Sequence, residues 1–341
     1  MPVTLKPLGQ QTIVITGASS GIGLATALKA AQRGARVVLA ARNADALERI
    51  AAQITKRGGQ ALAVPTDISD VDAVTRLRDA AIARFGGIDT WVNDAAAATY
   101  GKLADLTLAD HRQVFDIGYF GTVHGSLAFA AHARDGMGGA LINVGSILGE
   151  RSILMQGPYS AMKHALHGFT EALRTELEAD GAPISVTLIK PAAINTPYPE
   201  HARNVMERPA TLPPVLYDPR LVARAILFAA HTPRRMLTVG GTGRLMVTLA
   251  TLFPRATDRA MEAGGIAAQQ TDIPPASDRV DNLYTARADG AIEGSRSARV
   301  RRTSLWLEAQ MRPGIAVAAA TATSLGAMTI GALMRRHPPV R

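Results

Sequence analysis

The sequence predicts an α/β fold in which a doubly wound parallel sheet carries helices on both faces. As far as about residue 240, short apolar runs alternate with longer Ala-rich segments whose apolar residues recur at helical spacing. Several of these segments stop at glycine, as at Gly34, Gly58 and Gly86, which is typical of helix C-termini. Because the strand runs are apolar throughout, we expect both faces of the sheet to be buried.

The individual elements follow from this alternation. The expected strands are Thr12–Ile15, Arg36–Ala40, Ala61–Val64, Thr90–Val92, Ala140–Val144 and Ile184–Ile189. The clearest helical segments between them are Leu24–Arg33, Ala44–Lys56 and Ala73–Arg84. Strands separated by helices in this way form parallel connections.

After Gly241 the alternation stops. We expect a helix over Leu245–Phe253, and loops or turns at Pro254, Asp272–Ala276 and Asp289–Ser297. The chain is therefore predicted to divide into one main domain over residues 1–245, a C-terminal extension over 246–310 and an apolar tail over 311–341.

The tail contains an uncharged stretch, Gly314–Met334, flanked by Arg312 and by Arg335. As a helix it would be about 32 Å long, enough to cross a hydrocarbon core of about 30 Å. Its Ala, Thr and Gly content makes insertion marginal. Two alternatives stay open: contact with a membrane surface through residues 314–334, or packing against the body or a second subunit.

Composition narrows the class of protein. The apolar content of 47% and the charged content of 19% are ordinary for a globular chain. The absence of cysteine excludes disulfides and cysteine-ligated metals, and we expect no metal site. The net charge is +9, which could favour nucleic acid. Only 4% of the residues are aromatic, however, so few side chains could stack on bases, and no nucleic-acid partner is expected. Met1–Gln10 lacks the apolar run of a secretory signal, which favours a cytoplasmic location.

A glycine-rich turn, Thr16–Gly23, joins the first strand to the following helix. A sharp turn needs backbone freedom at Gly17, and the absence of side chains at Gly21 and Gly23 lets a pyrophosphate approach the amides of the helix start. Ser19 and Ser20 can add hydroxyl donors, and Ile22 lies within the same turn. At a strand-to-helix junction this pattern predicts a dinucleotide site.

The end of the second strand, Ala40-Ala41-Arg42, favours NADP(H) over NAD. An enzyme that uses NAD usually has an acidic residue here to accept from the ribose 2′-hydroxyl. Ala41 offers none, whereas Arg42 can form a charge-assisted pair with a 2′-phosphate. The alternative is a surface arginine without a ligand.

Tyr159 and Lys163 are four residues apart on a predicted helix, so their side chains share one face. An ammonium beside the phenol is expected to lower the pKa of Tyr159 from about 10 towards neutrality. Such a tyrosine can donate a proton in carbonyl reduction or accept one in alcohol oxidation. Ser146 follows the strand Ala140–Val144, at the sheet edge where α/β folds bind ligands.

These segments together resemble the short-chain dehydrogenase/reductase superfamily, single-domain proteins of Rossmann type, over roughly residues 8–240. The resemblance rests on Thr16–Gly23, Asp67-Ile68, Asn93–Ala96, Ser146, Tyr159–Lys163 and Pro191–Thr196. It implies that Ser146, Tyr159 and Lys163 are catalytic. It further implies that Asp67 and Ile68 lie at the adenine, that Asn93 supports the central strand, that Lys163 contacts the nicotinamide ribose, and that Ile194 and Thr196 contact the carboxamide. Ala95, Tyr159 and Pro191 complete the expected cofactor contacts.

Four positions in three segments depart from the family pattern. Asp94 and Ala96 replace the second asparagine and the glycine of Asn-Asn-Ala-Gly, and Ala192 replaces the glycine of Pro-Gly. Gly118 stands where the family commonly has an asparagine that helps to hold a proton-relaying water. Either water fills the vacated space and preserves some relay, or efficient catalysis has been lost.

Two functions are compatible with these features. The first is an NADP(H)-dependent oxidoreductase that interconverts an alcohol and a carbonyl, with an apolar substrate covered by Met155, Pro158 and Tyr198–Leu216. The second is an NADPH-binding sensor or scaffold with weak or no catalysis. The family resemblance also implies a homodimer or homotetramer.

Overall fold

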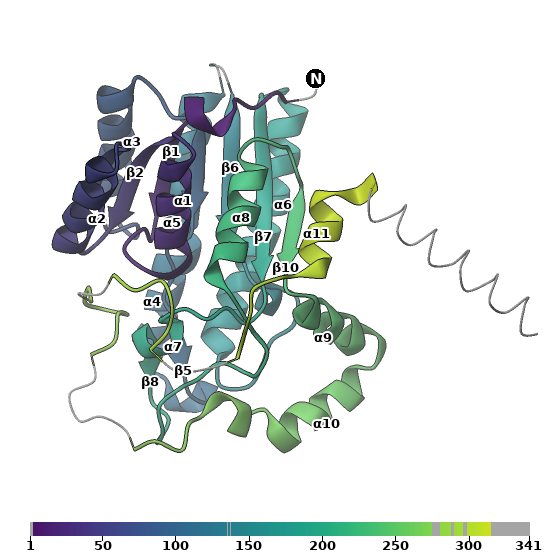
Figure 1. Ribbon diagram of the computed structural model, residues 1–341. Coiled ribbons are helices and arrows are strands. Elements are labelled where there is room, and N and C mark those ends of the chain that lie inside the picture. The colour runs from purple at the N-terminus through teal and green to yellow at the C-terminus, as the bar shows by residue number, and fades with distance from the viewer. Residues whose placement is uncertain are drawn as a thin grey trace, which may run out of the picture.

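The computed structural model describes residues 3–134, 136, 138–274, 280–287, 290–295 and 299–314. Its centre is a seven-stranded sheet in the order β10-β7-β6-β4-β1-β2-β3, and every pair of neighbours is parallel (Figure 1). The strands are β1 (Thr12–Thr16), β2 (Arg36–Ala41), β3 (Gln60–Pro65), β4 (Thr90–Asn93), β6 (Gly139–Val144), β7 (Ile184–Pro191) and β10 (Met236–Val239). The predicted fold class is confirmed, as are the six predicted strands. The seventh, β10, was not predicted.

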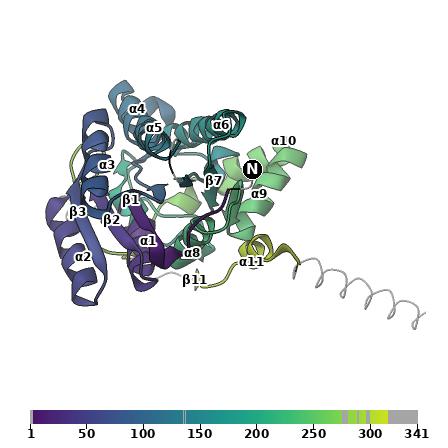
Figure 2. The same cartoon turned by 90° about the horizontal axis from the view of Figure 1, so that it is seen from above.

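Helices cover both faces of the sheet (Figure 2). One face carries α1 (Gly21–Gln32), α2 (Ala44–Lys56) and α8 (Pro219–Ala229), and the other carries α3 (Val71–Phe85), α4 (Leu108–Phe115), α5 (Gly121–Ala133) and α6 (Gly157–Ala179). Successive strand residues point to opposite faces, so Ile13 and Ile15 join the first core whereas Val14 joins the second. The sheet is therefore buried on both sides.

Short side chains at the helix starts explain where the helices begin. Asn43 accepts from the amide of Ala46 at the start of α2. Thr107 and Asp110 form a reciprocal capping box at the start of α4. At the other end of a helix, Gly86 adopts a left-handed φ of 82° and ends α3, as its position in the sequence predicted.

The carboxyl ends of the strands carry the smaller elements, which gather at the lower end of the molecule in Figure 1. These are β5 (Thr99–Tyr100), η2 (Leu103–Asp105), the π-helix η3 (Asp116–Phe120), η4 (Ile147–Gly149), α7 (Tyr198–His201), β8 (Arg203–Asn204), β9 (Leu216–Tyr217), α9 (Gly241–Leu252), α10 (Pro254–Gly264) and η5 (Ala267–Gln269). The short helix η1 (Leu8–Gln10) precedes β1 at the opposite end of the sheet. The predicted helix after Gly241 is confirmed as α9, which crosses the boundary predicted at residue 245.

The prediction of a loop at Pro254 is wrong, because this residue opens helix α10. Proline is compatible with the first turn of a helix, where its missing N–H would have no partner within the helix. The other two predicted loops, Asp272–Ala276 and Asp289–Ser297, lie partly outside the described residues, and their described parts contain neither helix nor strand.

The extension returns to the main domain. Strand β11 (Val300–Arg301) pairs with β9, and helix α11 (Leu305–Met311) lies beside the edge strand β10, in yellow in Figure 1. Leu307 of α11 is fully buried. The Gln310 amide accepts from Thr238 N at 2.9 Å and donates to Thr238 O at 2.8 Å. The extension is thus fastened to the last strand of the sheet.

No helix within the described residues is long and apolar enough to cross a bilayer. Most of the apolar stretch predicted to meet a membrane, residues 315–334, lies outside the described residues.

Candidate active site

A cavity of about 440 Å³ follows the carboxyl edge of the sheet. It brings together most of the predicted site residues: Gly17, Ser19, Ser20, Gly21, Ile22, Arg42, Asp67, Ile68, Ala95, Ser146, Tyr159, Lys163, Pro191, Ile194 and Thr196. Two predicted cofactor residues, Gly23 and Asn93, do not line it. The volume is within the usual range for small-molecule and cofactor sites.

The glycine-rich turn is closely packed. Gly17 has a φ of +73°, and a Cβ atom there would lie 2.9 Å from Ala95 Cα. A Cβ atom on Gly23 would lie 2.3 Å from Gly17 O. Side chains at either position would therefore open the turn, which explains the need for glycine at Gly23 although it does not face the cavity.

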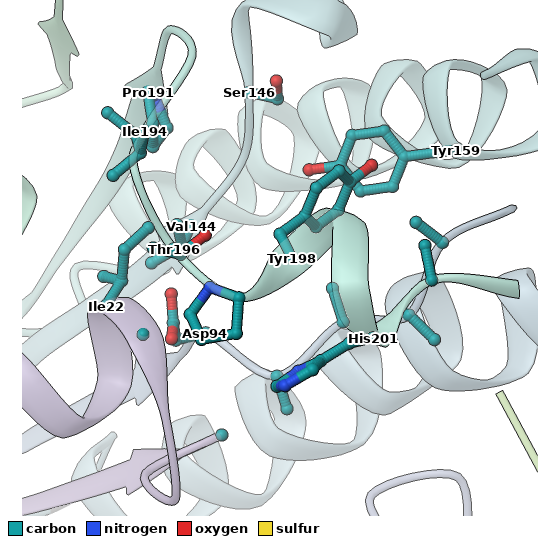
Figure 3. A pocket seen from close by; sticks show the side chains of 18 of the residues that line it. Ile22, Asp94, Val144, Ser146, Tyr159, Pro191, Ile194, Thr196, Tyr198 and His201 are labelled. Atoms are coloured by element: carbon teal, nitrogen blue, oxygen red, sulfur yellow. The ribbon is translucent and has the colours of Figure 1, made fainter. Parts of the chain in front are cut away.

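Whether the turn fits a pyrophosphate depends on which backbone N–H groups at the start of α1 have no acceptor within the protein. Gly21 N donates to Ala291 O at 2.9 Å, and Gly23 N donates to the Asp94 carboxylate. The described residues supply no acceptor for the amide of Ile22, whose side chain points into the cavity (Figure 3). This amide, at the positive end of a helix, fits a phosphate oxygen.

Asn93 lies below the cavity in a buried polar network. Its side chain donates to Asn143 Oδ1 at 2.9 Å and to Ser126 Oγ at 3.1 Å, and accepts from Trp91 Nε1 at 2.8 Å. These bonds tie β4 to β6 and α5 beneath the sheet edge. Asn93 therefore supports the strands that carry the site.

Ser146, Tyr159 and Lys163 converge from β6 and α6. The Ser146 hydroxyl accepts from Leu148 N at 3.0 Å as η4 begins, and the same hydroxyl hydrogen-bonds the Tyr159 phenol. Lys163 Nζ donates to Val144 O at 2.7 Å and lies 5.5 Å from the centre of the Tyr159 ring. Figure 3 shows Ser146 and Tyr159 in the same part of the cavity.

The electrostatics differ from the sequence-based expectation for Tyr159. Burial raises the pKa of this phenol well above its usual value; the Ser146 hydroxyl opposes the shift, and the Asp94 carboxylate adds to it. Burial also lowers the pKa of Lys163 to about 8, against the opposing effect of Asp94. The ammonium does not outweigh burial of the phenol, so the expected lowering of the Tyr159 pKa is not found.

Asp94 was missed as a site residue. It lines the cavity, its backbone N donates to Thr16 Oγ1 at 3.1 Å, and burial raises its pKa to about 7 although Lys163 opposes this shift. The signal in the sequence was a single acidic residue followed by five apolar or small residues, at the end of a buried strand.

Gly118 lies in η3 and faces Met162. A Cβ atom on Gly118 would lie 2.5 Å from Met162 Cε and 2.7 Å from its sulfur. Met162 is fully buried. A thioether side chain therefore occupies space that an asparagine side chain at this position would need.

The part of the cavity around Tyr159 is aromatic and apolar. Tyr198 packs edge-to-face on Tyr159 with ring centres 5.3 Å apart, and its hydroxyl donates to Gln156 Oε1 at 2.7 Å. The predicted covering segment Tyr198–Leu216 lines the cavity in part, with Tyr198, His201, Ala202 and residues 212–215. Met155 and Pro158 do not line it.

The extension also lines the cavity, which the sequence did not predict. Asn282, Ala286 and Arg287 lie at the end that holds Arg42. Arg42 donates to Asn282 O, and Asn43 Nδ2 donates to Arg287 O at 2.8 Å. These contacts join residues about 240 positions apart in the chain, so a local sequence pattern could not predict them.

Comparison with known proteins agrees with this geometry. The family model of the short chain dehydrogenases matches residues 11–206. The uncharacterized oxidoreductase YxnA of Bacillus subtilis is 43% identical over 316 residues, covering 92% of this chain and 89% of its own. The putative oxidoreductase SadH of Mycobacterium tuberculosis is 30% identical over 261 residues, covering 74% of this chain and 94% of its own.

Two solved dehydrogenase structures are also similar to this chain. A short chain dehydrogenase/reductase from Burkholderia phymatum in complex with NAD has a TM-score of 0.63 and 26% identity, and covers 80% of this chain and 100% of that one. An alcohol dehydrogenase from Thermococcus sibiricus complexed with 5-hydroxy-NADP has a TM-score of 0.59 at 23% identity, covering 67% and 95%; this likeness concerns the fold alone.

The fold and the family match define an oxidoreductase on a dinucleotide-binding α/β domain. The chain belongs to the short-chain dehydrogenase family.

Proposed function

We propose that the protein is an NADP(H)-dependent oxidoreductase that interconverts an alcohol and a carbonyl. The observation that carries the proposal is that Ser146, Tyr159 and Lys163 line the same cavity as the glycine-rich turn. Ile194 and Thr196 close that cavity from the end of β7. A dinucleotide spanning the cavity would have its phosphates at the start of α1 and its nicotinamide beside Tyr159.

The preference for NADP(H) rests on Arg42. It follows β2, where Ala41 replaces the acidic residue that an NAD site would use, and its guanidinium lines the cavity. The printed names of the similar structures include both NAD and an NADP analogue, so the residues of this chain carry the argument.

The reaction follows from the positions of three side chains. A bound nicotinamide supplies or accepts the hydride. In the reducing direction, the Ser146 hydroxyl donates a hydrogen bond to the carbonyl oxygen, and Tyr159 transfers its proton to that oxygen. Lys163 stabilises the phenolate left on Tyr159 until a proton returns from solvent. Alcohol oxidation reverses each proton transfer.

The walls near Tyr159 favour an apolar substrate. They include Leu148, Ile153 and Met246, which pack in one cluster with Tyr159 and line the cavity. Such a pocket binds a hydrocarbon or aromatic body and leaves the reacting oxygen to Ser146 and Tyr159.

One observation favours a second function, an NADPH-binding sensor or scaffold. Met162 occupies the space beside Gly118, so the position that commonly carries a water-holding asparagine has neither the amide nor the room. This alternative expects NADPH binding without reduction of any ketone or aldehyde in a broad panel.

Replacement of Tyr159 by Phe tests the proposal. We expect kcat for NADPH-dependent carbonyl reduction to fall by about 100-fold or more, since the proton donor is lost. The Kd for NADPH should stay unchanged in a fluorescence titration. Tyr119→Phe, outside the cavity, is the matched control and should keep full turnover. Undiminished turnover by Tyr159→Phe contradicts the assignment, and a silent wild type that binds NADPH favours the sensor.

A further inference from the structure

Residues 280–287 of the extension are held against the main domain at the end of the cavity that contains Arg42. Leu283 is fully buried and joins the core that contains Ile68. Gln113 Nε2 donates to Leu283 O at 3.3 Å, and Tyr284 Oη donates to Asp110 Oδ1 at 2.9 Å. Both partners belong to α4, so this helix fixes where the segment lies.

The segment brings a second arginine to the cavity. Arg287 lines it together with Arg42, and Asn43, the residue after Arg42, donates through Nδ2 to the backbone oxygen of Arg287 at 2.8 Å. Arg42 in turn donates to the backbone oxygen of Asn282. The Arg42 guanidinium thus contacts Asn282 O, and the Arg287 guanidinium contacts Val280 O, so both groups lie against the same short segment of the extension at this end of the cavity.

Neither guanidinium is neutralised by an acidic side chain within the described part of the chain. Arg287 Nη1 donates to two backbone oxygens, Glu200 O at 2.7 Å and Val280 O at 2.8 Å. Other arginines that contact the extension pair with carboxylates: Arg208 with Asp272, Arg220 with Glu293 and Arg224 with Glu308. Two uncompensated guanidinium groups on one cavity wall favour an anionic ligand that carries more than one charge.

We infer that Arg287 binds the 2′-phosphate of NADP(H) together with Arg42, so that the C-terminal extension is a wall of the cofactor site and determines its specificity. This inference rests on the proposed function. The 2′-phosphate is favoured over the pyrophosphate because Arg287 contacts Asn43, which follows the end of β2, whereas the Ile22 amide lies at the start of α1.

The test is the affinity of the full-length protein for NADP⁺ and NAD⁺, measured by calorimetry. We expect Arg287→Gln to raise the Kd for NADP⁺ about tenfold or more, while the Kd for NAD⁺ changes less than about twofold. Arg287→Lys keeps the positive charge but loses the planar guanidinium, so its Kd for NADP⁺ should lie between those of the wild type and of Arg287→Gln. The matched control is Arg302→Gln, which removes an exposed arginine of the extension that does not line the cavity and should leave both constants unchanged.

Each other outcome has one meaning. If Arg287→Gln leaves both constants unchanged, the inference is overturned. If it weakens both cofactors equally, the arginine only holds the segment in place, and the inference is again overturned. If the wild type binds NAD⁺ as tightly as NADP⁺, the proposed NADP(H) preference fails as well. A wild type that prefers NADP⁺, beside an unchanged Arg287→Gln variant, overturns this inference alone.

Discussion

At the scale of single residues, the chemistry of the cavity depends on a carboxyl group that the family pattern did not lead us to expect. Asp94 opposes the effect of burial on Lys163, and Lys163 opposes the effect of burial on Asp94. The pKa values of the two groups come to about 7 and about 8, within reach of neutral pH. Two coupled groups that titrate this close together are expected to shape the pH dependence of turnover.

Asp94→Asn is therefore expected to shift the pH profile of carbonyl reduction. Without the carboxylate, the pKa of Lys163 falls below about 8, because burial alone then acts on it. In the proposed mechanism Lys163 must be charged to stabilise the phenolate, so activity should decline with rising pH from a lower pH than in the wild type. The measurement is kcat/KM from pH 5 to 9. Asp72→Asn, at an exposed carboxylate, is the control, and a profile identical to that of the wild type would refute the coupling.

Ser146, Tyr159 and Lys163 could be grouped from the sequence, because a strand end and a four-residue helical spacing bring them together. Their protonation could not be predicted. The protonation of Tyr159 depends on how deeply its side chain is buried and on the carboxylate of Asp94, which follows strand β4. The position of Arg287 at the cavity could not be predicted for a similar reason, because nothing near it in the sequence relates it to Arg42.

At the scale of elements, the π-helix η3 shows how one position decides the local packing. Gly118 in η3 leaves room for Met162 of α6, and Thr122 Oγ1 donates to Gly118 O at 2.8 Å where η3 meets α5. The thioether thus fills a space that a larger residue at 118 would need.

Restoring asparagine at this position should therefore destabilise the protein. We expect Gly118→Asn to lower the free energy of unfolding by about 1–3 kcal/mol, because Met162 is fully buried and has little room to withdraw. Met162→Ala in the same chain should recover much of the loss. Urea denaturation measures both effects. Gly168→Asn, where a Cβ atom meets nothing within 4 Å, is the control, and equal stability of Gly118→Asn and wild type would count against the packing argument.

Six strands could be predicted because their apolar runs are continuous and are separated by helical segments. Strand β10 (Met236–Val239) was missed because it directly follows two arginines and because Thr238 interrupts its short apolar run. The π-helix could not be predicted either, since its extra residue has no periodic signature and depends on packing against α6.

At the scale of the whole molecule, the C-terminal extension is part of the folded body. It lines one end of the cavity with Asn282, Ala286 and Arg287, pairs β11 with β9 and packs α11 beside β10. The alignment with YxnA covers 92% of this chain, so it reaches well into the extension. Beyond the helix predicted at Leu245–Phe253 the sequence indicated only loops and turns, because these contacts connect residues far apart and follow no local period.

The stability of the protein should therefore depend on α11. We expect Leu307→Ala to lower the free energy of unfolding by about 2–5 kcal/mol, since it deletes a fully buried side chain. Leu305→Ala on the same helix removes a leucine that is 85% exposed, and its effect should stay within about 0.5 kcal/mol. Thermal and urea denaturation compare the two variants. Equal effects would mean that α11 does not dock in solution as it does here.

The amide of Gln310 has a consequence beyond the free energy of docking. By bonding both backbone groups of Thr238, it takes the place that a neighbouring strand would have at the edge of the sheet. A strand edge with unpaired N–H and C=O groups is a template on which other polypeptides can add. Helix α11 thus covers part of an edge on which a strand of another molecule could otherwise pair.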